Sequence, residues 1–105
     1  MPPITVTVSW PSNSPVPVVD KDPIVVPKGS GATVIQWTCG NNVASLKISA
    51  LDPNVFTPSA SQGFVNRFST TDANQVPQVC TYDVAATRTA GGTAAHDPKI
   101  ENGGK

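Results

Sequence analysis

The dipeptide Asp-Pro occurs three times in this chain of 105 residues, as Asp22-Pro23, Asp52-Pro53 and Asp97-Pro98. Asp-Pro is the most acid-labile peptide bond, because the aspartate carboxyl can attack its own carbonyl carbon and the proline nitrogen is a good leaving group. The dipeptide also has a structural use. Proline fixes its own φ near about −65° and pushes the preceding residue into an extended conformation. The three steps therefore predict strand boundaries, and each contains a bond that acid chemistry could cleave.

Other catalytic or metal-binding patterns do not reach a complete set. His96 is the only histidine, so a blue-copper site lacks ligands, and two cysteines with one histidine do not have zinc spacing. Asp20 and Asp22 form an Asp-x-Asp pair that could offer oxygen atoms to calcium, but a solvated turn explains the pair more simply. We therefore expect no metal and no other cofactor.

Charge and hydropathy bear on the class of partner. Charged residues make up 13% of the chain and sum to zero, so we expect no nucleic-acid partner. No segment approaches the roughly 18 consecutive apolar residues that a membrane span needs. Residues 1–4 do not resemble a signal peptide. The compartment stays open: the protein is intracellular, or it is a secreted chain given without its signal.

Strand patterns dominate the sequence. Eleven prolines, one glutamate and two leucines disfavour helices. Turn residues separate the alternating segments about every 8 to 12 residues, which predicts an all-β, two-sheet β-sandwich, immunoglobulin-like in architecture. A small Greek-key barrel is the alternative. The sandwich would have about seven or eight short strands, at residues 4–10, 18–19, 24–26, 33–39, 44–50, 64–68, 79–87 and 96–101.

We expect a single domain over residues 1–101 and a tail over residues 102–105. Large aromatic side chains should supply much of the core, each burying on the order of 150–250 Å². These side chains are Trp10, Trp37, Phe64, Phe68 and Tyr82, with Phe56 covering one end.

Cys39 and Cys80 fall on the predicted inner faces of two central strands. Their separation and the nearby Trp37 resemble the bridged pair of immunoglobulin domains. A disulfide closing a loop of about 40 residues would stabilise the fold by roughly 4 kcal/mol. Two buried free thiols, behaving as small apolar groups, are the alternative.

Two segments resemble the DP-EP family of small bacterial β-sandwich proteins. The first is Asp22-Pro23-Ile24-Val25-Val26, followed by Ile35-Gln36-Trp37. The second begins at Cys80-Thr81-Tyr82-Asp83-Val84 and continues, after a glycine turn, with the run from His96 to Gly103. One member of that family is described as a self-cleaving aspartic-type peptidase. The resemblance implies that Asp97-Pro98 is the cleaved bond, with Asp97 supplying its own carboxyl and Asp20 or Asp22 as the partner carboxylate.

Such cleavage requires Asp97 to be protonated or to lie next to a proton donor, because an isolated aspartate with a pKa near about 3.9 is ionised at neutral pH. A second carboxylate nearby raises one of the two pKa values. We therefore expect Asp22 and Asp97 to meet at one end of the sandwich.

Two functions of different class follow. The neutral charge, the proline-marked edges and the incomplete catalytic set favour a non-catalytic binding or assembly module. It would engage another protein, or a second copy, by adding a strand at an open sheet edge. The alternative is an aspartic-type protein that cleaves its own Asp97-Pro98 bond.

Overall fold

The computed structural model describes residues 3–105, and this part of the chain is all-β, as predicted. It contains no helix long and apolar enough to cross a membrane. Over these residues the structure has eleven strands rather than seven or eight, because two of the predicted strands are each split and a short one is added. The strands are β1 (Ile4–Ser9), β2 (Val18–Val19), β3 (Ile24–Val26), β4 (Thr33–Cys39), β5 (Val43–Ser49), β6 (Phe56–Thr57), β7 (Arg67–Asp72), β8 (Pro77–Thr81), β9 (Asp83–Arg88), β10 (Thr93–His96) and β11 (Lys99–Gly103).

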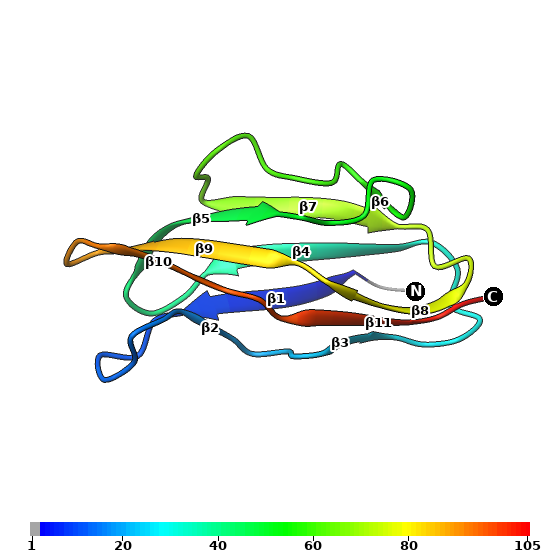
Figure 1. Ribbon diagram of the computed structural model, residues 1–105, viewed down its shortest axis with the longest axis horizontal. Helices are drawn as coiled ribbons and strands as arrows, with labels where there is room; N and C mark the ends of the chain where they lie inside the picture. Colours follow the sequence, from blue (N-terminus) through cyan, green and yellow to red (C-terminus); the bar gives the residue numbers. More distant parts are fainter. Residues whose placement is uncertain (1–2) are drawn as a thin grey trace.

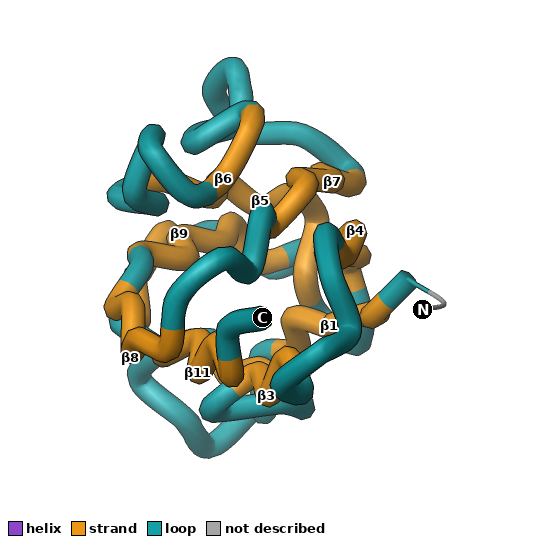
Figure 2. The backbone as a smooth tube through the Cα atoms, turned by 90° about the vertical axis from the view of Figure 1, so that its right-hand side faces the viewer, coloured by secondary structure: helices purple, strands orange, loops and turns teal. Residues whose placement is uncertain are grey.

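The strands between residues 3 and 105 form two layers. One is a five-stranded sheet with the order β2-β1-β4-β7-β6. The other combines the three-stranded sheets β10-β9-β5 and β3-β11-β8, because β8 runs into β9 and β10 runs into β11 as one long hairpin (Figure 1). Seen along the strands, the layers surround a common interior (Figure 2). This arrangement fits the predicted small β-sandwich, and its immunoglobulin-like strand order stays a prediction.

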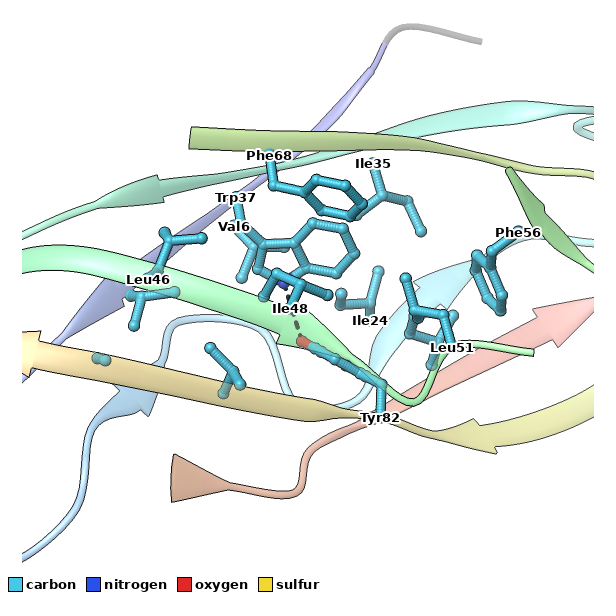
Figure 3. Packing of buried hydrophobic residues seen from close by; sticks show 14 of the residues in the cluster. Val6, Ile24, Ile35, Trp37, Leu46, Ile48, Leu51, Phe56, Phe68 and Tyr82 are labelled. Atoms are coloured by element: carbon cyan, nitrogen blue, oxygen red, sulfur yellow. Dashed lines mark hydrogen bonds between the residues drawn. The ribbon is translucent and has the colours of Figure 1, made fainter. Parts of the chain in front are cut away.

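The core forms where inward positions of the two layers meet. In β4, Ile35 and Trp37 are fully buried while Val34 faces outward, as the alternation predicts. The Trp37 ring stacks on Phe68 with ring centroids 5.8 Å apart and meets Tyr82 edge-on at 5.3 Å. Trp37 Nε1 also donates a hydrogen bond to the Tyr82 hydroxyl at 3.0 Å (Figure 3). This bond ties β4 of one layer to the hairpin of the other.

One predicted core residue is wrong. Phe64 is 45% exposed, whereas Phe68 is buried. The predicted strand does not start until Arg67, and before it only Val65 pairs in the sheet, through two backbone bonds to Leu46. The bends at residues 62–64 and 66 break the period of two, so residues 64 and 68 do not share a face.

The chain near its end is also more ordered in the sheet than predicted. β11 continues through Gly103, and Asn102 is only 5% exposed. Residues 102 and 103 therefore belong to the sandwich rather than to a tail. Phe56 is buried in the same core cluster as Leu51, and the two side chains lie next to each other (Figure 3).

Candidate functional site

Asp97 and Pro98 lie at the break between β10 and β11, where the long hairpin changes from one small sheet to the other. The pairing register is the same on both sides of this break: His96 is opposite Val84, and Lys99 is opposite Thr81. Tyr82 N donates to Pro98 O at 3.0 Å across the gap. Asp97 is exposed and Pro98 is buried. The Asp97–Pro98 bond thus joins a surface residue to an inward one.

The carboxyl group in contact with Asp97 belongs to Asp83. The two side chains are within hydrogen-bond reach, and Ser49 Oγ donates to Asp83 Oδ2 at 3.3 Å. Partial burial raises the pKa of Asp83, and the hydrogen bond and negative charge of Asp97 raise it further. Ser49 and the charge of Lys47 offset part of this increase. Two acids in contact therefore lie beside the bond, and Asp83 keeps its proton to a higher pH than an ordinary aspartate.

Asp22 reaches the same segment from β3's side of the molecule. Its Oδ2 lies 3.4 Å from His96 Nε2, and its Oδ1 accepts a hydrogen bond from Lys99 N at 3.1 Å. Asp22 thus contacts residues on both sides of the Asp97–Pro98 bond, and its expected meeting with Asp97 itself stays a prediction. Asp22 is placed to hold the backbone around the bond.

Asp20, the other residue proposed from the resemblance, is engaged elsewhere. Its Oδ1 accepts a hydrogen bond from Thr7 N at 2.9 Å, and its Oδ2 lies 3.6 Å from Lys21 Nζ. These contacts hold it at the edge of β1 rather than at the Asp97–Pro98 bond.

Sequence reasoning missed Asp83, although a signal for it was present. The turn at Gly91 and Gly92 predicts a hairpin. Once His96 is placed opposite Val84, the next pair outward is Asp97 and Asp83. Residues directly opposite in an antiparallel pair have side chains on the same face. The register, rather than the Asp-Pro motif, identifies the second carboxyl.

Cys39 and Cys80 are free thiols in the structure, which is the second of the two alternatives. Cys39 ends β4, where it pairs with Val8 of β1, whereas Cys80 lies in β8 and pairs with Ile100 of β11. The disulfide, the other alternative, is therefore not formed: β4 belongs to the five-stranded sheet and β8 to the other layer, and the two cysteines are not bridged across the interior. Burial raises the pKa of both thiols, so neither is an activated nucleophile.

A second feature is a hollow of about 180 Å³ lined by Trp10, Arg88 and their neighbours. The Arg88 guanidinium lies 4.5 Å from the centre of the Trp10 ring and donates to Ser14 O at 3.0 Å. These interactions fasten the 11–17 loop to β9 and use the groups that a ligand would need. Residues 3–105 contain no cluster of three or more side chains suited to holding a metal ion.

Comparison with known proteins adds no relative. No protein-family model matches this chain, and no curated protein matches it. The resemblance to the DP-EP family therefore stays a prediction, and the functional argument depends on the chemistry of Asp97 and its neighbours.

Proposed function

We propose that this protein is a self-processing β-sandwich that cleaves its own Asp97–Pro98 bond at mildly acidic pH. One observation carries the proposal: the Asp97 carboxyl is in hydrogen-bond contact with Asp83, a carboxyl whose pKa is raised. Cleavage of this type needs a proton donor beside the aspartate, and Asp83 supplies one from the neighbouring strand.

The reaction would proceed in two steps. An oxygen of the Asp97 carboxylate attacks the carbonyl carbon of Asp97, the bond to the Pro98 nitrogen breaks, and a proton from Asp83 passes to that nitrogen. The products are a cyclic anhydride at Asp97 and a free amine at Pro98. Water then hydrolyses the anhydride, and ionised Asp83 accepts the proton that the water releases. One water is consumed, and Asp83 returns to its starting state.

The other two Asp-Pro steps serve as internal comparisons. The Asp52 carboxyl accepts a hydrogen bond from Asn54 N at 2.9 Å, within its own turn, and the Asp22 carboxyl accepts one from Lys99 N. Both carboxyls are thus engaged by backbone N–H donors. Among the three aspartates, Asp97 alone contacts another carboxyl.

Intact-protein mass spectrometry after incubation across a series of pH values from neutral to acidic tests the proposal, because cleavage should increase as Asp83 gains its proton. We expect two products, residues 1–97 and 98–105. Asp97→Ala should abolish cleavage, and Asp83→Asn should slow it at least about a hundredfold, the range of general acid catalysis. Asp52→Ala is the matched control and should leave the rate unchanged. A chain that stays intact, or that is cut equally at all three Asp-Pro steps, would contradict the proposal.

A non-catalytic binding module is the second candidate, and the exposed face of β3-β11-β8 favours it. Val25 and Val79 are 57% and 61% exposed and flank Glu101, which is paired with both. Within residues 3–105, β8 forms a ladder with β11 alone, so its other edge could accept a strand from another chain or a second copy. Analytical ultracentrifugation of the intact chain tests this. Self-association that Val79→Lys removes would support it, and a monomer at all concentrations would leave only a different protein as partner.

A further inference from the structure

We propose that β3 and β8 form a peptide-binding site, the groove that β11 fills in the intact chain. Its ligand is the segment 98–105, supplied by the same chain or by a second copy. Cleavage at Asp97–Pro98 would turn this segment from a covalent strand into an exchangeable peptide. The exchange rests on the proposed function for the chain break, but the binding site does not, because its contacts can be tested with any cut at this junction.

The backbone of β11 is held on both sides. It pairs in parallel with β3, where Ile100 is opposite Ile24, and antiparallel with β8, where Ile100 is opposite Cys80. Main-chain bonds of this kind give affinity in proteins that bind peptides by strand addition. Here the peptide strand lies between two receptor strands rather than at one edge.

Alternate side chains of β11 enter the protein. Ile100 is fully buried in the core, and Asn102 is 5% exposed and donates from Nδ2 to Asp72 Oδ1 at 2.8 Å. Lys99 and Glu101 point outward and are exposed. The buried carboxylate selects for asparagine, because a ligand without that amide would leave Asp72 Oδ1 with the Asn74 N bond alone.

Two glycines complete the recognition. A Cβ atom at Gly103 would lie 2.7 Å from the Cα atom of Lys28, so any larger residue would meet backbone. Gly104 has φ of +84°, a conformation that side-chain-bearing residues rarely adopt, and its Cβ would lie 2.8 Å from Pro77 N. Its own N donates to Asn74 Oδ1 at 2.9 Å, and its carbonyl oxygen accepts from Gly29 N at 3.0 Å. The groove thus recognises the pattern Ile-x-Asn-Gly-Gly.

Contacts at the start of the segment also survive a break at Asp97–Pro98. Pro98 O accepts from Tyr82 N at 3.0 Å, and Lys99 N donates to Asp22 Oδ1 at 3.1 Å. Neither bond uses an atom of the scissile peptide link. After cleavage, the ladder, the buried Ile100 and the Asn102 contact remain available to hold the peptide.

The test uses the full chain with a protease recognition sequence inserted between Asp97 and Pro98, cut after folding. Native mass spectrometry should show the 98–105 peptide still bound at one per molecule. An isotope-labelled peptide of the same sequence, Pro-Lys-Ile-Glu-Asn-Gly-Gly-Lys, should replace it. A competitor peptide carrying Asn102→Ala or Gly103→Ala should compete roughly tenfold or more weakly. A competitor with Glu101→Gln is the matched control, and it should compete equally because Glu101 is exposed.

Three results would overturn the peptide site: loss of the peptide on dialysis of the cut protein, no replacement by labelled peptide, or equal competition by the Asn102→Ala peptide. Failure of the proposed function is separable from these. If the wild-type chain never cuts itself but the protease-cut protein holds and exchanges the peptide, the site stands and self-processing fails. If the wild-type chain cuts itself and then loses the peptide, self-processing stands and the site fails.

Discussion

Replacing Tyr82 by phenylalanine should destabilise the fold by about 1–3 kcal/mol, the cost of leaving a buried donor without its partner. The Tyr82 hydroxyl accepts a hydrogen bond from Trp37 Nε1 at 3.0 Å, and the two residues are 1% and 0% exposed. Phenylalanine keeps the ring and its packing but removes this acceptor. The indole N–H would then be buried between the two layers, where water cannot replace the lost bond.

The loss is large for a domain of this length, whose total stability is about 5–15 kcal/mol. Each kcal/mol lowers the melting temperature of such a domain by about 4–8 °C, so a fall of roughly 5–20 °C is expected. Trp37→Phe and the double variant Trp37→Phe/Tyr82→Phe complete a cycle that separates the bond from the packing. Removing donor and acceptor together should cost less than the sum of the single changes, by about 1 kcal/mol or more.

Urea denaturation followed by circular dichroism measures the four stabilities. An alkaline titration adds an independent check, because Tyr82 is the only tyrosine and phenolate absorbance reports on it alone. Burial raises the pKa of Tyr82, and the hydrogen bond from Trp37 offsets part of the increase. The folded pKa thus exceeds the unfolded value near about 10, so its contribution is complete below about pH 10 and is lost as the pH rises. A Tyr82→Phe change below about 0.5 kcal/mol, within the range of ordinary surface substitutions, would refute the reasoning. Ionisation of the tyrosine near about pH 10 in the folded protein would refute it equally.

Two further predictions concern β11 and the buried Asp72 that contacts it. Burial raises the pKa of Asp72, and bonds from Asn74 N and Asn102 lower it less, so the folded state binds a proton more readily than the unfolded chain. The Asp72 contribution to stability should therefore rise as the pH falls from 7 to about 4. The Asp72→Asn variant should be more stable than the wild type at neutral pH, and its stability should no longer increase through this group as the pH falls. Urea denaturation at several pH values measures this, and a pH profile equal to that of the wild type would contradict a raised pKa at Asp72. Gly103→Ala should destabilise by about 1–3 kcal/mol, because its Cβ would meet the backbone of Lys28. A melting temperature equal to that of the wild type would show that the backbone moves apart freely.

Much of the fold could be predicted because most of its strands bury one face. The alternation in β1, β4 and β5 places Val6, Trp37 and Ile48 inside, as the structure has them. The same reasoning fails where a polar residue is buried. Asp72 falls between the strands predicted at 64–68 and 79–87, but it ends β7 with no exposed surface, and Asn74 N and Asn102 donate to its Oδ1. Pattern alone does not reveal such a partner when it lies thirty residues away.

The candidate site could be predicted only where its residues carry a sequence motif. Asp97 and Asp22 are marked by the motif itself, and both lie at the same break in the sheet. Asp83 carries no motif, and its place depends on pairing between β9 and β10. A motif search locates the bond, whereas the register of the hairpin locates the second carboxyl beside it. The tail was misjudged because a glycine-rich sequence usually marks a turn, while here Gly103 and Gly104 meet backbone that allows no side chain.

Pro98 underlies both the structural and the chemical interpretation of the Asp97-Pro98 step. Proline lacks the N–H group that a ladder needs, so the hairpin omits a bond where β10 becomes β11, yet the register on the two sides is unchanged. That omission leaves Asp97 at the surface while Pro98 turns inward to start a buried strand. The same proline is the leaving group that makes the bond labile. Asp22-Pro23 also precedes a strand and Asp52-Pro53 opens a turn, so the backbone role of the proline does not by itself set Asp97 apart. The distinction lies in Asp83, a carboxyl of raised pKa in contact with Asp97, where the carboxyls of the other two aspartates accept from backbone N–H groups.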